Sequence, residues 1–331
     1  MIAVIPVAGA GKNLRPLTYT QPKPLIPVAG KPIISFIIDD LKRVGVTEFV
    51  FIIGYLGEKI RNYITDQYPE LKCTFIKQEN RLGSGHAILL AENKIDLSQE
   101  LVIFFGDTIL NFDLEKVMKS PMNYVGVKKV SDPRSFGVAT IGKDGYVTSL
   151  VEKPNIPLSN LALVGFYKIK DTKALFESLK RNIDSEVKSD GEFQLTDALM
   201  GMVSQGCKIK TEIVDNWFDC GRKDILLETN ALMLEKKDFQ TPVVNNLNNS
   251  IIIPPVNIGE GCEINDSIIG PHVTIGNNSK LSSAIIKNSI LGNFVHINEA
   301  VLFNSVIGND TSITGLRQSL NIGDNTEIDF R

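Results

Sequence analysis

Aliphatic residues recur every five or six positions along the carboxy-terminal quarter of the chain. The recurrence runs through Ile258, Ile264, Ile269, Ile275, Leu281, Ile286, Leu291, Ile297, Leu302, Ile307 and Ile313. Gly or Asn often follows, and both residues suit tight corners better than helices. This hexapeptide period predicts a parallel β-helix, in which each aliphatic side chain stacks on its equivalent in the next coil. The eleven steps amount to about four coils of three sides, and a β-sandwich is the competing fold for so Ile-rich a segment.

The composition changes sharply near residue 250. Residues 251–331 contain twelve charged residues, whereas the first 250 contain the other 61. Every Tyr and the only Trp also precede residue 251. We therefore expect three parts: a first domain over 1–230, a connecting helix and Asn-rich linker over 231–250, and the β-helix over 251–331.

The first part alternates β-rich runs with stretches of helical character. These segments cover 2–8, 32–45, 48–55, 59–68, 73–78, 84–95 and 100–110. Such alternation predicts an α/β domain with a parallel sheet and helices on both of its faces. Function is then expected at the carboxyl ends of the strands. Pro6 is awkward in a central strand, because proline cannot donate a backbone hydrogen bond.

Charge and cysteine usage narrow the class of partner. The chain has 35 basic and 38 acidic residues, a net charge of -3, which argues against binding nucleic acid or a membrane surface. Small molecules become the expected partners. The four cysteines are far apart and form no C-x-x-C pair, so we expect a reducing cytoplasm. The apolar run at the start is too short for a signal peptide or a membrane span.

A glycine loop follows the first expected strand. It contains Gly9, Gly11, Lys12 and Arg15, a combination that lets backbone N–H groups approach a phosphate while basic side chains offset its charge. The loop lacks both the G-K-[ST] of a P-loop and the third glycine of the dinucleotide fingerprint. Taken alone, it could equally be a structural turn.

The order of the motifs is more specific than any one of them. The glycine loop precedes PKPLIPVAGKPII, Gln78 with GSGHA, FFGDTIL, FGV, EKP, LVGFY, GEFQLTDA and WFDCG. In this order the chain resembles the sugar-1-phosphate nucleotidyltransferases, and most closely the glucose-1-phosphate thymidylyltransferase-like members that have a left-handed β-helix tail. The resemblance implies a Rossmann-like domain with a mixed, mostly parallel sheet, followed by a left-handed parallel β-helix. It covers the chain from residue 1 through the tail.

The resemblance also implies roles for individual residues. Lys23 would contact the transferred phosphate, and Asp107 with Asp219 would hold Mg²⁺. The nucleotide would bind at Ala8, Gly9, Gly11, Lys12, Gln78 and Gly83, and the sugar phosphate at Gly137, Glu152, Lys153, Gly165 and Trp217. The substrates would be a nucleoside triphosphate and a sugar-1-phosphate, which reacts in line at the α-phosphorus and releases pyrophosphate without a protein nucleophile.

Physical chemistry bears on two of these roles. An Asp at the end of a buried strand is costly unless it is paired, and Mg²⁺ prefers one or two carboxylates plus phosphate oxygens, although Asp107 could instead cap a helix. Lys153 precedes a proline and could be a solvated turn lysine.

The loop departs from the family at one position. The family's G-x-G-T-R has its Arg where this chain has Asn13. We expect Arg15, assisted by Lys12, to supply the missing charge, although a lysine does not reproduce the fork of a guanidinium.

Two alternatives therefore stay open. One is a non-catalytic regulatory or sugar-nucleotide-binding homologue, which Asn13 favours. The other is a bifunctional enzyme whose tail is an acyltransferase using His272 or His296 as a base. Assembly alone is the simpler role for the tail, since the apolar faces and open end of the β-helix predict a homo-oligomer.

Overall fold

The computed structural model describes residues 1–241 and 247–316 of the chain. The chain divides into two compact units. The first comprises Met1–Ile26 with Lys31–Leu226, and the second Pro27–Gly30 with Leu227–Arg331. Two stretches lie outside the described residues: 242–246 of the expected linker and 317–331 of the expected β-helix.

A nine-stranded sheet forms the centre of the first unit. Its main order is β10 (Val147–Glu152), β9 (Gly137–Ile141), β11 (Leu161–Ile169), β6 (Leu101–Phe104), β1 (Ile2–Val7), β4 (Glu48–Ile53) and β5 (Lys72–Lys77), with β8 (Asn123–Lys129) beside β11 and β12 (Ile209–Ile213) beside β8. The four strands β6, β1, β4 and β5 are parallel, whereas β11 is antiparallel to β6. The sheet is therefore mixed, as the resemblance implied.

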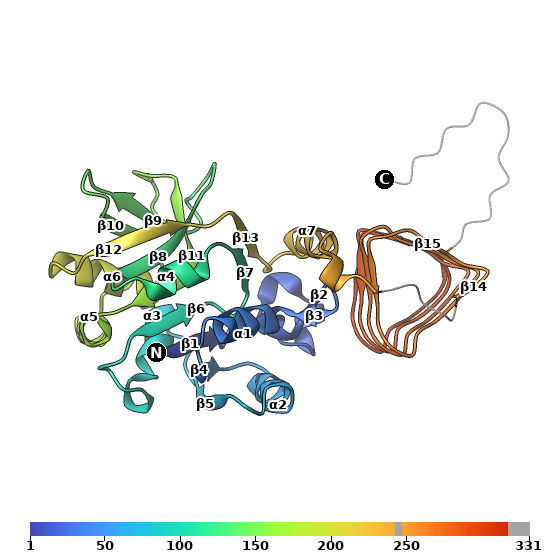
Figure 1. Cartoon of the computed structure of the whole chain (residues 1–331), viewed down its shortest axis with the longest axis horizontal. Coiled ribbons are helices and arrows are strands. Elements are labelled where there is room, and N and C mark those ends of the chain that lie inside the picture. Colours follow the sequence, from blue (N-terminus) through green and yellow to red (C-terminus); the bar gives the residue numbers. More distant parts are fainter. Residues whose placement is uncertain (242–246, 317–331) are drawn as a thin grey trace. The chain divides into compact units, whose positions relative to one another are not determined.

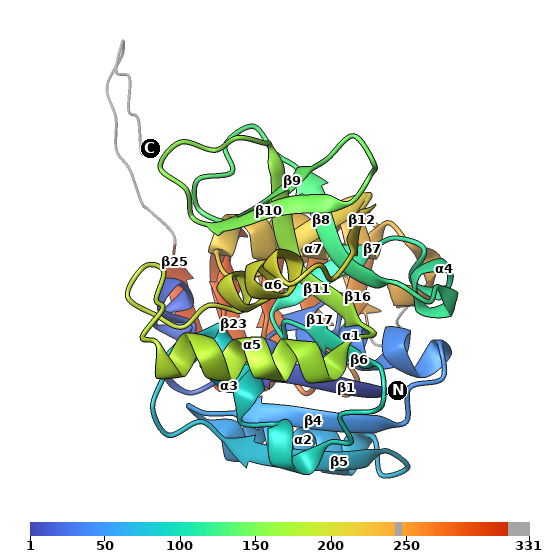
Figure 2. The same ribbon diagram turned by 90° about the vertical axis from the view of Figure 1, so that its left-hand side faces the viewer.

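Both faces of β6, β1 and β4 are buried, which explains the nearly continuous apolar runs in these three strands. Ile2 and Val4 lie in one core with residues of α3 (Ser84–Leu89), α5 (Thr172–Asp184) and α6 (Leu195–Ser204). Ala3 and Ile5 lie in the other, with residues of α1 (Ile33–Arg43), α2 (Gly57–Gln67) and α4 (Leu114–Lys119). Figure 2 shows α5 and α6 side by side. The predicted α/β domain with helices on both faces is confirmed.

Pro6 occupies a central strand without breaking a ladder. The pairing of β1 with β6 ends at Val4, while its pairing with β4 continues through Pro6 to Val7. The carbonyl of Pro6 accepts a hydrogen bond from the Gly106 N–H at 3.3 Å, beyond the end of β6. The missing N–H of Pro6 therefore falls where no neighbouring strand needs it.

Short elements complete the first unit and lead out of it. The 3₁₀ turns are η1 (Lys12–Leu14), η2 (Leu17–Tyr19), η3 (Lys23–Leu25) and η4 (Glu92–Lys94), and a separate ribbon pairs β7 (Thr108–Asn111) with β13 (Asn216–Asp219). Further elements are β2 (Pro27–Val28), β3 (Lys31–Pro32), α7 (Lys223–Leu234) and η5 (Lys237–Phe239).

Parallel strands along three sides form the second unit (Figure 1). The first side contains β14 (Leu247–Asn248), β17 (Glu263–Asn265), β20 (Lys280–Ser282), β23 (His296–Phe303) and β25 (Ser312–Leu316). The second contains β15 (Ile251–Ile252), β18 (Ile268–Ile269), β21 (Ile285–Lys287) and the far end of β23. The third contains β16 (Val256–Ile258), β19 (Val273–Ile275), β22 (Ser289–Leu291) and β24 (Val306–Ile307).

The eleven periodic aliphatic residues occupy three columns in the interior of this unit. The first-side column holds Ile264, Leu281, Ile297 and Ile313, the second-side column Ile269, Ile286 and Leu302, and the third-side column Ile258, Ile275, Leu291 and Ile307. Each pairs with its equivalent one coil away, and all eleven belong to or pack against one apolar core. The predicted parallel β-helix is confirmed, and the competing β-sandwich is wrong.

The corners of the coils explain the Asn and Gly that punctuate the repeat. Asn288 and Asn304 have positive φ angles at equivalent corners of successive coils, a conformation that asparagine tolerates. At another corner, the Oδ1 atoms of Asn277 and Asn293 each accept a hydrogen bond from a backbone N–H of the preceding coil, at 2.9 and 2.8 Å. A polar side chain thus satisfies the backbone where strand pairing stops.

Candidate active site

The carboxyl ends of four strands meet at one edge of the first unit's sheet. Because β6, β1, β4 and β5 are parallel, the residues that follow them lie at the same edge. These residues begin with Ala8 after β1, Gly54 after β4, Gln78 after β5 and Phe105 after β6. Ligands of α/β sheets bind at the carboxyl ends of the strands, so the polar side chains at this edge are the candidates for a functional site.

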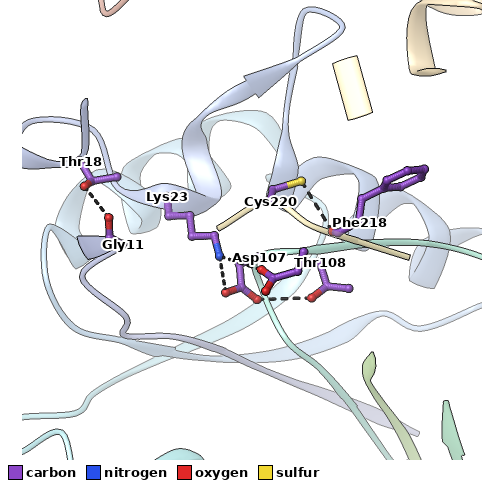
Figure 3. Close-up of polar contacts among 8 residues, drawn as sticks. Gly11, Thr18, Lys23, Asp107, Thr108, Phe218 and Cys220 are labelled. Carbon is purple, nitrogen blue, oxygen red and sulfur yellow. Dashed lines mark hydrogen bonds and ion pairs between the residues drawn. The ribbon is translucent and has the colours of Figure 1, made fainter. Parts of the chain in front are cut away.

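A buried lysine joins two carboxylates at this edge. The Lys23 Nζ donates to Asp107 Oδ2 at 2.7 Å and to Asp219 Oδ1 at 3.2 Å, and Figure 3 shows the contact with Asp107. The Lys23 side chain is only 11% exposed, whereas those of Asp107 and Asp219 are 41% and 50% exposed. The lysine is thus the buried base of a cluster whose carboxylates face solvent.

The ribbon of β7 and β13 brings the two carboxylates together. Asp219, the last residue of β13, is in register with Thr108, which directly follows Asp107. The Cys220 N–H donates to the Asp107 carbonyl at 3.2 Å, so the backbones are tied next to the side chains. Antiparallel pairing therefore brings Asp107 and Asp219, which are distant in sequence, to the same Lys23 ammonium.

The two carboxylates keep Lys23 charged. Burial lowers the pKa of Lys23, but the charges of Asp107 and Asp219 and their hydrogen bonds raise it by more, so the net pKa lies above its usual value. Lys23 is therefore an ammonium ion throughout the physiological pH range. Its charge can act on an anion bound above the cluster.

A first cavity of about 260 Å³ opens beside this cluster. Four of the expected nucleotide-binding residues line it together with Asp107: Ala8, Gly9, Gln78 and Gly83. The Gln78 Nε2 lies 3.2 Å from the Gly83 carbonyl oxygen and 3.1 Å from His86 Nδ1. Burial lowers the pKa of His86, so the neutral ring can accept this bond. The amide of Gln78 is thereby held in one orientation in the cavity wall.

Gly83 is required by its conformation and its surroundings. It has a φ of +113°, and a Cβ atom there would lie 2.4 Å from the Phe193 carbonyl oxygen. The Gly85 N–H also donates to that oxygen, at 2.8 Å. The glycine therefore allows the loop after β5 to pack directly against the segment that precedes α6.

A second cavity of about 190 Å³ adjoins the first. The expected sugar-phosphate residues Gly137, Glu152, Gly165 and Trp217 line it, together with Asp107 and Asp219. The two cavities share Ser84, Phe105 and Asp107 in their walls. Asp107 therefore lies at the junction of the two cavities.

Glu152 has a defined partner in this second cavity. Thr196 Oγ1 donates to Glu152 Oε2 at 2.6 Å. Burial raises the pKa of Glu152, and the hydrogen bond from Thr196 offsets only part of that effect. Trp217, which packs edge-on against Phe136 with ring centroids 4.7 Å apart, has a buried indole N–H without a partner among the described residues. The carboxylate of Glu152 and the hydroxyl of Thr196 thus lie in the wall of this cavity, which suits a ligand rich in hydroxyl groups.

Several expected residues lie outside the walls of both cavities. Lys12 and Arg15 are exposed, and the guanidinium of Arg15 stacks on the ring of Tyr19 at 5.0 Å. Gly11 has a φ of +60°, and its carbonyl accepts a hydrogen bond from Thr18 Oγ1 at 2.8 Å (Figure 3). The glycine loop therefore contributes its first glycine to the cavity wall, whereas Lys12 and Arg15 line neither cavity.

Lys153 also lies outside the cavity walls. It pairs with Asp190, and the hydrogen bond that its ammonium donates to this carboxylate raises the pKa of Lys153. Its backbone has a φ of +40°, so the residue forms part of a tight turn after β10. Lys153 is thus an exposed turn lysine, as the alternative interpretation expected, and it pairs with a loop carboxylate.

The histidines of the tail have separate surroundings. His272 Nε2 lies 2.7 Å from Glu235 Oε1, and His296 is exposed on β23. Neither lines the two cavities described here. The geometry offers the acyltransferase alternative no specific support.

Sequence reasoning missed several residues of the cavity walls. Arg81, Ser84 and Glu192 line the first cavity, and Thr196 lines the second. The motifs GSGHA and GEFQLTDA contained three of these four residues, so a signal was present without an assigned role. Arg81 lay between motifs and had no signal of its own.

Comparison with protein-family models matches both parts of the chain. The model described as nucleotidyl transferase matches residues 2–236, and the one described as a GlmU-like C-terminal hexapeptide matches residues 243–310. Separately, no helix among the described residues is long and apolar enough to cross a membrane.

Curated relatives include three kinds of protein. A low-salt glycan biosynthesis nucleotidyltransferase, Agl11, of Haloferax volcanii is 36% identical over 72% of this chain and 68% of its own length. A bifunctional protein GlmU of Methanococcus vannielii is 36% identical over 76% of this chain, which spans 59% of that relative. A glucose-1-phosphate thymidylyltransferase of Streptomyces antibioticus is 30% identical over 80% of this chain and 74% of its own length.

Solved structures agree on the fold. A putative glucose-1-phosphate thymidylyltransferase from Bacillus anthracis superimposes with a TM-score of 0.61 at 27% identity, covering 70% of this chain and 95% of that one. A UDP-glucose pyrophosphorylase in complex with UDP-glucose superimposes with a TM-score of 0.62 at 23% identity, covering 71% and 98%.

Proposed function

Since the chain belongs to the nucleotidyl transferase family, we propose that it transfers a nucleotidyl group from a nucleoside triphosphate to a sugar-1-phosphate and releases pyrophosphate. Family membership confirms the resemblance found in the motifs. The observation that carries the proposal is the junction of two cavities at Asp107, directly beside the Lys23 ammonium.

The two cavities suit the two substrates of such a reaction. The first is lined by backbone glycines and the Gln78 amide, groups that can approach a base and a phosphate closely. The second is lined by Glu152 and Thr196, whose side-chain oxygens can bind sugar hydroxyls. Two ligands bound in this way would present their phosphates to each other near Asp107, and holding them there supplies much of the acceleration.

The chain's own groups act on charge rather than as nucleophiles. An oxygen of the sugar phosphate attacks the α-phosphorus in line, and the bond to the leaving pyrophosphate breaks. Lys23, held in place by two carboxylates, offsets the negative charge that develops on the phosphorus oxygens.

The carboxylates of Asp107 and Asp219 suit a divalent cation. They converge on one ammonium, about half of each side chain is exposed, and Mg²⁺ is usually held by one or two carboxylates together with phosphate oxygens and waters. The described residues contain no group of three or more His, Cys, Asp or Glu that could hold a metal alone, so substrate phosphates would complete the shell. When bound, Mg²⁺ would screen charge on the phosphates.

We propose dTTP and glucose-1-phosphate as the first substrate pair to test. The support is that the Streptomyces antibioticus relative, at 30% identity, is a glucose-1-phosphate thymidylyltransferase, and that the Bacillus anthracis structure, at 27% identity, is described as a putative one. We also propose that the protein acts in the cytoplasm, consistent with its four free cysteines.

The test is pyrophosphate release with Mg²⁺ from a substrate matrix. It combines dTTP, UTP, GTP, CTP and ATP with the 1-phosphates of glucose, mannose, galactose and N-acetylglucosamine. We expect release with one or two pairs, abolished by Asp107→Asn and retained by Asp66→Asn, a matched change at an exposed position on α2. Silence across the matrix, with a nucleotide or sugar nucleotide still bound in calorimetry, would favour the non-catalytic homologue.

We further propose that the β-helix mediates a homo-oligomer. Ile251, Ile268, Ile285 and Val301 are in register along the outside of the second side, and Ile251, Ile285 and Val301 are 59%, 41% and 46% exposed. A continuous aliphatic stripe of this kind favours association. Light scattering should give a mass above that of one chain, reduced by Ile285→Glu but not by Lys280→Glu on the first side. An equal mass for all three proteins would contradict the proposal.

A further inference from the structure

Arg81 is the one cationic side chain among the described residues that line the first cavity. The other ionisable side chains in that wall are the carboxylates of Asp107 and Glu192. The Lys23 ammonium already donates to Asp107 and Asp219, and Arg15 and Lys12 do not line this cavity. A polyanion that enters this cavity therefore meets two carboxylates and, from the wall itself, one guanidinium.

The guanidinium of Arg81 has no carboxylate partner among the described residues. Arg61, Arg134 and Arg222, by contrast, each pair with a carboxylate. The Arg81 guanidinium lies over the face of Tyr55, 5.9 Å from the ring centroid. The five N–H donors of the guanidinium therefore remain available to a ligand.

Tyr55 is itself held in place. It lies in the turn after β4, where the following residue, Leu56, has a φ of +54°. The Tyr55 hydroxyl donates to the Tyr19 carbonyl oxygen at 2.9 Å, and Arg15 stacks on the Tyr19 ring. Two arginines are thus supported by two tyrosines that a hydrogen bond links, and of the two arginines Arg81 is the one that lines the cavity.

We infer that Arg81 binds the phosphate chain of the nucleoside triphosphate, and that Tyr55 positions it. The inference rests on the proposed function. A planar guanidinium suits this role because it can donate two parallel hydrogen bonds to phosphate oxygens, which an ammonium cannot do. Arg81 would then supply the positive charge that the sequence led us to expect from Arg15.

Steady-state kinetics tests this assignment, with the substrate pair that the matrix selects. Arg81→Gln should raise KM for the triphosphate about 10- to 100-fold, the usual effect of losing a hydrogen bond between charged groups, and leave KM for the sugar-1-phosphate unchanged. Arg81→Lys should recover only part of the loss. Arg61→Gln, which removes an arginine on α2 that pairs with Glu58, is the matched control and should match wild type.

Two Tyr55 variants test positioning. Tyr55→Phe keeps the ring but removes the hydrogen bond to Tyr19, and Tyr55→Leu removes the stacking surface as well. We expect KM for the triphosphate to rise in the order Tyr55→Phe, then Tyr55→Leu, with kcat changed less than KM. Equal values for both variants and wild type would show that Tyr55 does not position Arg81.

Calorimetry separates a phosphate contact from a base contact. We expect Arg81→Gln to weaken binding of the triphosphate about tenfold or more while leaving the monophosphate of the same nucleoside unchanged. Equal weakening of both would overturn the phosphate assignment, as would an unchanged triphosphate KM in Arg81→Gln combined with a raised one in Arg15→Gln. Either result in an enzyme that still turns over leaves the proposed function standing, whereas wild-type silence in the substrate matrix removes that function first.

Discussion

Replacing Lys23 with Met tests whether the lysine and two carboxylates act as one unit. Methionine keeps much of the side chain's apolar length but removes the ammonium that bonds to Asp107 and Asp219 at 2.7 and 3.2 Å. The two carboxylates then face each other without a cation. We expect Lys23→Met to lose activity and, separately, to have a lower free energy of unfolding than wild type.

The size of each effect follows from the exposure of the three side chains. Removing one partner of a fully buried ion pair costs about 3–5 kcal/mol. Here the carboxylates are 41% and 50% exposed and can be rehydrated, so Lys23→Met should lower the free energy of unfolding by only about 1–3 kcal/mol. Losing a group that stabilises the transition state should lower kcat about 10²- to 10³-fold.

A double-mutant cycle with Asp219→Asn makes the reasoning testable. In wild type, Asp219→Asn removes one bond to Lys23 and should destabilise. In the Lys23→Met background it removes repulsion between carboxylates, so it should be neutral or stabilising. Urea unfolding, followed by the fluorescence of Trp217, the only tryptophan, measures the effect of Asp219→Asn on the free energy of unfolding in both backgrounds.

The exposed pair Lys72 and Glu48 provides the control cycle. Their charged atoms lie 2.8 Å apart, and such surface pairs usually contribute about 0.2–1 kcal/mol. If Asp219→Asn has the same effect with and without Lys23, within about 0.5 kcal/mol, the three side chains are independent and the interpretation of the cluster is refuted.

Three further predictions concern other parts of the molecule. Because burial raises the pKa of Glu152, the native state loses stability as pH rises from the ordinary pKa of 4.5 through the raised one. In urea unfolding, Glu152→Gln should therefore be as stable as wild type at pH 4 and more stable than wild type at pH 7. An equal difference in stability at both pH values would contradict this. Ile286→Ala, in the fully buried second-side column, should lower the stability of the β-helix by about 2–5 kcal/mol in thermal unfolding, and a cost below 1 kcal/mol would argue against the stacked core. Lys168 is fully buried and pairs with the partly exposed Glu100 at 3.2 Å, so Lys168→Met should cost about 1–3 kcal/mol in the same assay, whereas a gain in stability would show that desolvation outweighs the pair.

The β-helix was predictable because its signal is local. Residues such as Ile264 and Leu281 stack at a fixed interval along the chain, so the spacing of the sequence is also the spacing of the coils. The awkwardness of Pro6 was predictable too. Its solution, the end of β6 beside it, depends on the register of a neighbouring strand, which residue spacing alone does not contain.

The cluster of Lys23, Asp107 and Asp219 could be expected from motifs but not from spacing. Lys23 is 84 positions from Asp107 and 196 from Asp219, and their meeting depends on the pairing of β7 with β13. The direct contact of the lysine with both carboxylates was not expected. Their roles in catalysis and metal binding stay predictions.

The direction of side chains in loops was the least predictable feature. Arg15 follows the glycine loop in sequence, but the 3₁₀ turn there directs it onto Tyr19 rather than into the cavity wall. Arg81 lies in a loop with no recognisable motif and reaches the wall because β5 ends beside it. Neither direction follows from residue type or spacing, because both depend on local backbone turns.

The most direct test of nucleotidyl transfer follows the phosphorus atoms of the triphosphate. The protein is incubated with a sugar-1-phosphate, Mg²⁺ and the selected nucleoside triphosphate, labelled in separate reactions at the α- or the γ-phosphorus. We expect the α label to appear in a nucleoside-diphosphate sugar and the γ label in pyrophosphate, and neither product to form with Asp107→Asn. Transfer of the γ label to the sugar, or its release as free phosphate, would contradict nucleotidyl transfer.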